Sequence, residues 1–311
     1  MTRLALSIAG SLFLAVSASA QSGSISWSTD VKGSIARAKS TRLPLMFYVI
    51  GRSSDRPHDI EREQKRAFAD PLVVQLSQRF IPVKLSRSLY EDLLEKWQVP
   101  RQANMWIVFA TPDGDKLGVL DSPGATKADS LAQKMNLSFR LYRQQMFDRE
   151  LRPKLEDETA PAADLKIALK AIDAFTILTA DQSLIKLMER RRLEKSVEKM
   201  CYDVLAKLST PACVNELLKR AADGDQQATA ALSKCTPGAA EQMLAELGGD
   251  DPELHLIVYR AVTKICKVRQ PKSDRFWDGK NERIKAEEVE RIKQLVRETA
   301  RRWKEQHEEY R

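Results

Sequence analysis

The sequence predicts an α/β domain followed by an all-α domain. The short apolar runs rich in β-forming residues all lie before residue 121, whereas from residue 164 onward apolar residues recur only at helical spacing. Part of the helical region also repeats itself 26 residues later. At 311 residues, the chain is long enough for two domains, each with its own hydrophobic core.

The N-terminus has the features of a signal peptide over residues 1–20. Arg3 supplies a positive charge, residues 4–16 are nearly all apolar, and Ala18-Ser19-Ala20 forms a small-x-small cleavage pattern before Gln21. We therefore expect a secreted or periplasmic protein, with an uncleaved N-terminal anchor as the alternative. No later stretch reaches the ~18 apolar residues of a membrane-spanning helix, so we expect no transmembrane segment after cleavage.

Residues 21–147 alternate between strand-like and helix-like segments. Residues 21–29 predict a tether and a short first strand, and Asp30 is a candidate N-cap for a helix that ends before Pro44. Strands are expected at 43–50 and 80–85. Helices are expected at 58–79, with a restart at Asp70-Pro71, and at 89–97.

A hairpin and a closing helix complete this first region. Residues 105–110 form the most β-like run of the chain, and Pro112-Asp113-Gly114 separates it from a second run at 117–120. Residues 127–145 then carry apolar side chains at helical spacing. The resulting order fits a small mixed sheet with helices on both faces.

This order, together with several residues, resembles the thioredoxin-like family over residues 25–147. The resemblance is carried by Trp27, Ala36, Ala38, Leu43-Pro44-Leu45-Met46-Phe47, Phe68, Asp70-Pro71, Val73-Val74, Phe80-Ile81-Pro82-Val83, Val99, Phe109 and Pro112-Asp113-Gly114. It implies a thioredoxin-like fold for this part of the chain.

The chain departs from that family at the redox site. The loop that would carry Cys-x-x-Cys contains no cysteine, and serine cannot form a disulfide. The family's cis-proline position falls near Ala103 or Asn104, and Pro100 comes several residues too early. The resemblance therefore implies a redox-inactive domain, with the loop as a tentative contact edge formed by Gly51, Arg52, Ser53, Ser54, Asp55, Arg56 and Asn104.

Residues 148–163 are expected to form a linker, because Pro153 and Pro161 flank the acidic run Glu156-Asp157-Glu158. The first part of this segment can also extend the preceding helix.

Residues 164–270 predict a domain of short helices, including one at 239–247. Thr210-Pro211 and Asp225 recur as Thr236-Pro237 and Asp251. These units resemble HEAT-type repeats with a short period, in which paired helices bury a shared face against their neighbours. An irregular helical bundle is the alternative, because two matching units are fewer than a stable repeat array needs.

The last segment, 271–311, predicts a loop and an amphipathic helix over residues 281–310. The aromatic pair Phe276-Trp277 is expected to pack back on the helices before it. The helix carries one apolar stripe and is expected either to pack on the repeats or to bind a partner. The stripe consists of Ile284, Val289, Ile292, Leu295, Val296, Thr299 and Trp303.

Four cysteines, all in the second half, leave the thiol chemistry open. They allow three disulfide pairings, and buried free thiols are an equal alternative. They are Cys201, Cys213, Cys235 and Cys266. The histidines, at 58, 255 and 307, lack the spacing of a metal site, so no metal is expected.

The charge balance argues against a nucleic-acid partner. Lys and Arg total 51 against 43 Asp and Glu, for a net charge of +8, and the two signs are interleaved without a dense basic stripe.

These features predict a protein-binding or scaffold protein without catalytic activity, bound to an unknown protein partner in the export compartment and needing no cofactor. Two alternatives remain. One is a thiol–disulfide oxidoreductase or chaperone with an unorthodox site, and the other is a structural component of the cell envelope.

Overall fold

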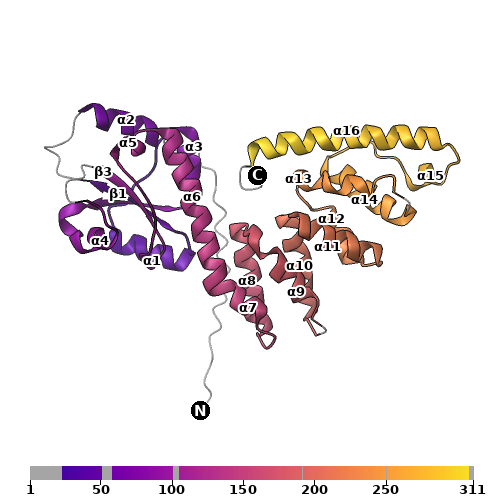
Figure 1. The fold of residues 1–311 in the computed structure, drawn as a ribbon, viewed down its shortest axis with the longest axis horizontal. Coiled ribbons are helices and arrows are strands. Elements are labelled where there is room, and N and C mark those ends of the chain that lie inside the picture. The colour runs from indigo at the N-terminus through magenta and orange to yellow at the C-terminus, as the bar shows by residue number, and fades with distance from the viewer. Residues whose placement is uncertain (1–22, 51–57, 101–104, 191, 250, 308–311) are drawn as a thin grey trace, which may run out of the picture. The chain divides into compact units, whose positions relative to one another are not determined.

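The computed structural model describes residues 23–50, 58–100, 105–190, 192–249 and 251–307 (Figure 1). The chain divides into two compact units, Met1–Tyr142 and Arg143–Arg311. The expected signal peptide at 1–20 lies outside the described residues, as do the loop residues 51–56 and Asn104.

The first unit is built on a four-stranded mixed sheet in the order β2-β1-β3-β4. Its strands are β1 (Leu45–Ile50), β2 (Ile81–Ser86), β3 (Met105–Ala110) and β4 (Lys116–Leu120). β1 runs parallel to β2 and antiparallel to β3, and β4 runs antiparallel to β3. The α/β prediction for this part of the chain is therefore confirmed. The short first strand expected within 21–29 is reduced to one bridge between Ser28 and Val83.

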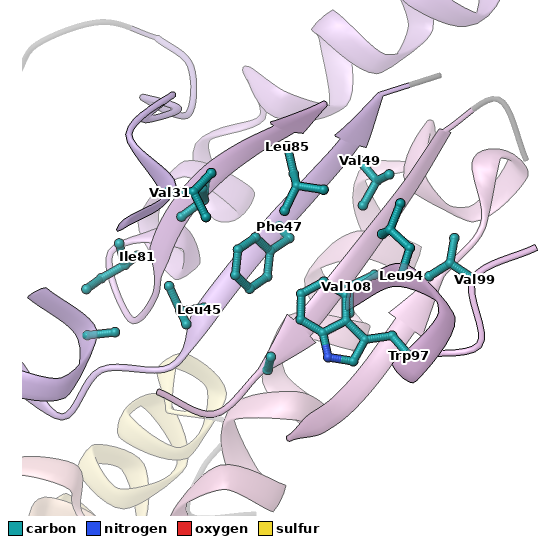
Figure 2. Close-up of a cluster of buried hydrophobic side chains, with 13 residues drawn as sticks. Val31, Leu45, Phe47, Val49, Ile81, Leu85, Leu94, Trp97, Val99 and Val108 are labelled. Carbon is teal, nitrogen blue, oxygen red and sulfur yellow. The ribbon is translucent and has the colours of Figure 1, made fainter. Parts of the chain in front are cut away.

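One face of the sheet packs on α1 (Val31–Thr41) and α4 (Glu91–Lys96). Figure 2 shows the buried cluster there, in which Phe47 of β1 meets Trp97 at the end of α4 with ring centroids 4.8 Å apart. Because side chains alternate along a strand, Leu45 and Val49 point to this same face.

The opposite face carries an aromatic cluster. Phe80 lies against Phe109 of β3 and Phe139, with ring centroids 5.3 and 5.9 Å away, and Tyr48 lies 5.4 Å from Phe68. The helices on this side are α2 (His58–Phe68), α3 (Pro71–Ser77), α5 (Ser122–Ala125) and α6 (Ala128–Met146) (Figure 1). Both faces are thus buried, which explains why the strands read as nearly continuous apolar runs.

The helix starts and the hairpin expected from sequence are present. The Asp30 carboxylate accepts a hydrogen bond from the Gly33 amide at 2.9 Å, and Asp70 caps α3 with Pro71 in its first turn. In the hairpin turn, Gly114 adopts a φ of 86°, a left-handed conformation that glycine reaches without steric cost.

The segment expected to be a linker, 148–163, is helical through Glu156. It comprises a π-helical turn, η3 (Phe147–Leu151), and α7 (Arg152–Glu156). Phe147, Leu151 and Leu155 follow one another at four-residue spacing and are all fully buried. Burial of this apolar stripe outweighs the helix-breaking tendency of Pro153, which lies in the first turn of α7, where proline is tolerated.

The described part of the second unit, which begins at Arg143, is helical and contains no strand, in agreement with the all-α prediction. Its further elements are α8 (Ala162–Phe175), η4 (Leu178–Ala180), α9 (Asp181–Met188), α10 (Lys195–Leu208), α11 (Pro211–Ala222), α12 (Gln226–Leu232), α13 (Pro237–Ala240), η5 (Gln242–Ala245), α14 (Pro252–Ile265), α15 (Asp274–Trp277) and α16 (Glu282–Gln306).

The 26-residue sequence repeat corresponds to equivalent helix starts. Asp225 caps α12 and Asp251 caps α14, each through two backbone amides 2.8–3.1 Å from its carboxylate. Thr210 caps α11, whereas the equivalent Thr236 makes no side-chain capping bond. The helix expected at 239–247 is accordingly replaced by the single turn of α13 and the 3₁₀ turn η5.

The C-terminal helix α16 buries Val289, Ile292 and Val296, which confirms three of the seven residues of the expected stripe, and it also buries Ala300. Leu295, Thr299 and Trp303 are half-buried. Ile284 is wrong as a core position, because its side chain is 43% exposed. Glu288, which is not part of the expected stripe, is buried and accepts a hydrogen bond from Tyr259 of α14. Trp303 packs so closely on Gly238 of α13 that a Cβ there would lie 2.7 Å from two ring atoms.

Candidate functional site

The sheet register brings the two predicted contact segments to one edge of the first unit. Ile50, the last residue of β1, pairs with Met105, the first residue of β3. The segments 51–57 and 101–104 therefore both adjoin this edge. The residues predicted to bind, Gly51, Arg52, Ser53, Ser54, Asp55, Arg56 and Asn104, lie outside the described residues, so their role stays a prediction.

The described part of the same edge offers contact surface. Ser86, at the end of β2, pairs with Ile50 in parallel register, and η2 (Arg87–Leu89) follows at once. The Leu89 side chain is 74% exposed. The guanidinium of Arg87 donates a hydrogen bond to the carbonyl of Pro100, which fixes η2 against the chain before residue 101. This edge therefore exposes one large apolar side chain on a turn that a hydrogen bond holds in place.

The structure holds the four cysteines as free thiols, all in the second unit. Cys201 lies in α10, Cys213 in the first turn of α11, Cys235 just after α12, and Cys266 at the end of α14. The first three are buried and the fourth is half-buried. Their pairing into disulfides stays a prediction.

Burial makes these thiols poor nucleophiles. It raises the pKa of Cys201 and Cys235 to about 12 and that of Cys213 to about 11, and it also raises the pKa of Cys266. The thiolate is the reactive form of cysteine. The raised pKa values favour the protonated, less nucleophilic form of all four thiols at neutral pH.

We expect slow alkylation of the native protein. With a pKa of about 12, roughly one Cys201 thiol in ten thousand is ionised at pH 8. Iodoacetamide at pH 8, followed by mass spectrometry, should modify Cys266 first and the buried three only after unfolding in guanidinium chloride. Rapid modification of Cys201 or Cys235 in the folded chain would contradict this expectation.

A polar cluster joins α14, α15 and α16 inside the second unit. The Tyr259 hydroxyl donates to the Glu288 carboxylate at 2.8 Å and accepts from the Lys272 amide at 2.7 Å. Arg291 donates two hydrogen bonds to the same carboxylate, at 2.7 and 2.8 Å. The Tyr259 hydroxyl and the Glu288 carboxylate are thereby paired, which gives the cluster a structural role. Among the described residues, the adjoining Nε2 of His255 and Nε1 of Trp277 are buried without a hydrogen-bond partner.

His255 and Trp277 adjoin this cluster. The imidazole Nδ1 accepts a hydrogen bond from the Gly248 amide at 2.8 Å, which requires neutral histidine with its proton on Nε2. Burial, together with the charge of Lys285, lowers the pKa of His255. The indole ring of Trp277 lies edge-on 4.5 Å from the imidazole and 4.8 Å from Tyr259, as expected for this aromatic pair.

Among the described residues, no group of three His, Cys, Asp or Glu side chains is placed to hold a metal ion. The same residues include no helix long and apolar enough to cross a membrane. Comparison with protein-family models, curated proteins and solved structures gave no match.

Proposed function

We propose that this protein is an exported binding or scaffold protein without catalytic activity. A redox-inactive thioredoxin-like domain forms its first unit, and a HEAT-like helical surface forms its second. The observation that carries the proposal is the placement of the thiols: they are absent from the sheet unit and mostly buried, with raised pKa values, in the helical one.

The sheet topology supports the thioredoxin-like part of the proposal. The order β2-β1-β3-β4, with one parallel pair followed by two antiparallel pairs, matches the parallel unit and hairpin that the resemblance implies. The helices lie on both faces of this sheet, as the resemblance also implies (Figure 1). The segment corresponding to the redox loop adjoins the edge at Ile50.

The packing order of the second unit supports the helical-surface part. α10 packs against α8, α9, α11 and α12, and α11 and α12 in turn pack against α14. Contacts between helices that follow one another along the chain are typical of repeat proteins, whose stacked units present an extended surface. The equivalent capping residues Asp225 and Asp251 support the same interpretation.

An insulin-reduction assay tests the absence of thiol catalysis. The mature chain beginning at Gln21, with dithiothreitol as reductant, should not accelerate insulin precipitation above the dithiothreitol background. Cys266→Ser is the matched variant, because it removes the thiol that is only half-buried. Turnover by the mature chain that this or another cysteine substitution abolishes would establish the oxidoreductase instead.

A crosslinking capture experiment from the native compartment tests the binding role. Arg52→Glu/Arg56→Glu should reduce recovery of the partner that the wild-type chain captures. Arg37→Glu/Lys39→Glu makes the same charge change near the end of α1, which precedes the opposite end of β1, and should leave recovery unchanged. Equal loss in both variants would argue against a contact at the sheet edge. Co-purification with envelope material alone would favour a structural component.

A further inference from the structure

A charged groove of about 450 Å³ lies in the second unit between α13 and α16. Figure 1 shows these two helices side by side, and they pack directly on each other. The groove is lined by Glu241, Arg297, Arg301, Lys304 and Glu305. Its volume falls in the range of about 300–1,000 Å³ that is typical of ligand sites.

Two of the cations in this groove have no partner in the described part of the protein. Lys304 donates to Glu241 at 2.7 Å, so these two side chains form an ion pair within the groove. Arg297 and Arg301 make no hydrogen bond or ion pair with any described residue. They are separated by one helical turn on α16, so their side chains start from neighbouring positions on one face, with Cβ atoms about 5–6 Å apart.

The walls of the groove are held in place by packing beside it. Trp303 contacts the backbone of Gly238 so closely that no larger residue fits there without a shift. The same indole stacks on the His307 ring at 4.3 Å, with 12° between the ring planes. The Lys304–Glu241 bond joins the end of α13 to α16. These contacts join α13 to α16, so the Cβ atoms of Arg297 and Arg301 are fixed relative to the rest of the groove.

We propose that this groove binds a carboxylate-rich peptide segment of the partner protein. The proposal rests on the binding function proposed above and names the chemistry that its helical surface recognises. The planar guanidinium donates two parallel hydrogen bonds to a carboxylate, so Arg297 and Arg301 can each hold one acidic side chain of the segment.

The two carboxylates of the groove favour a peptide over a phosphate-rich ligand. Glu305 places negative charge beside the guanidinium groups, and Glu241 adds an acceptor whose charge Lys304 partly offsets. Such charge repels a polyphosphate or nucleic-acid backbone, in which charge is dense and no hydrogen-bond donor accompanies it. A peptide carries backbone N–H groups that can donate to these carboxylates, while its acidic side chains bind the arginines.

Fluorescence anisotropy with fluorescein-labelled hexaglutamate and the full mature chain provides a direct test. The Arg297→Gln/Arg301→Gln variant should raise the Kd by about 10-fold or more, because it removes two sets of charge-assisted hydrogen bonds. Labelled hexaglutamine should bind at least about 10-fold more weakly than hexaglutamate to the wild-type chain. Circular dichroism should show that the variant is folded, since both side chains are exposed.

Arg275→Gln/Arg283→Gln is the matched control, because it removes the same charge from exposed residues of α15 and α16. Position 283 lies about 21 Å from position 297 along the helix, beyond the ~8 Å screening length at physiological salt. The control should change the Kd by less than about 2-fold. Equal weakening by both variants, unchanged binding by the groove variant, or tighter competition by pyrophosphate than by hexaglutamate would overturn the proposal.

The capture experiment separates this inference from the proposed function. A wild-type chain that captures a partner, with equal recovery by Arg297→Gln/Arg301→Gln, would refute the groove and leave the binding function intact. Failure of the wild-type chain to capture any partner would refute the binding function. The hexaglutamate titration would then still show whether the groove binds carboxylates.

Discussion

Replacing Trp97 by alanine is expected to lower the free energy of unfolding of the first unit by about 3–5 kcal/mol, the usual cost of truncating a large buried aromatic side chain. The indole is 1% exposed and lies 4.8 Å from Phe47 at the centre of the core between the sheet and α4 (Figure 2). Its Nε1 also donates to the carbonyl of Gly114 at 3.0 Å, which ties α4 to the hairpin turn.

Trp97→Phe is the matched control for this prediction. Phenylalanine keeps a ring against Phe47 but cannot donate to Gly114, so about 1–2 kcal/mol should be lost. Hydrogen exchange measured by mass spectrometry reports the two units separately. Protection in β1 and β3 should fall in both variants, with α10 and α11 unchanged. Loss of protection in α10 without loss in β1 would contradict the assignment of Trp97 to an independent core of the first unit.

The fold class could be predicted because its determinants are local. The strands combine β-forming residues with burial on both faces, and this pattern is visible as apolar runs at 43–50 and 105–110. The helix starts at Asp30 and Asp70 follow from capping chemistry within three residues of each aspartate. The hairpin follows from a glycine in a left-handed turn position.

The structure differs from the expectations, or decides between them, where distant residues determine the local structure. The acidic, proline-containing segment after residue 147 has the composition of a linker, but Leu151 and Leu155 find a buried environment there. The helix expected at 239–247 is reduced to two short turns beside Gly238, which packs on Trp303, a residue 65 positions further along the chain. A local sequence window shows neither the burial of Leu151 and Leu155 nor the contact between Gly238 and Trp303.

The candidate site was predicted only in part for a similar reason. The loop residues 51–56 were singled out by the missing cysteines, and the register of Ile50 with Met105 brings their segment to the edge shared with 101–104. Arg297 and Arg301 lie among several arginines of α16, and no sequence pattern distinguishes them from the others. The groove that distinguishes them forms only when α13 packs on α16. Glu288 is one of three glutamates within residues 287–290, and the sequence does not show that it alone is a buried partner of Tyr259.

Replacing Glu288 by alanine is expected to destabilise the second unit by about 2–3 kcal/mol, because the Tyr259 hydroxyl and the Arg291 guanidinium lose their shared acceptor. The carboxylate is 5% exposed, whereas half of the Arg291 side chain reaches solvent, which keeps the cost below that of a fully buried pair. Glu290→Ala is the matched control on the same helix. Its carboxylate is exposed and lies 3.6 Å from Lys293, so its loss should cost less than about 0.5 kcal/mol.

The same substitution should change how stability depends on pH. Burial raises the pKa of Glu288, but the hydrogen bonds from Arg291 and Tyr259 outweigh it, so the pKa lies below its usual 4.5. The unfolded chain therefore binds the proton more readily, and the stability from this group is present above pH 4.5 and lost as the pH falls through the folded pKa. The free energy of unfolding of the wild type, measured with urea, should fall as the pH is lowered through this window. Glu288→Ala should not show this decrease.

A second pH-dependent loss of stability, linked to His255, should persist in the Glu288 variant. The pKa of His255 is lowered from 6.5 by burial and by Lys285, so neutral imidazole is favoured in the folded chain. Its stabilising effect is present above pH 6.5 and lost as the pH falls through the folded pKa. His255→Gln should remove this loss alone. Coincident pH profiles of the wild type and both variants would show that neither group is coupled to folding.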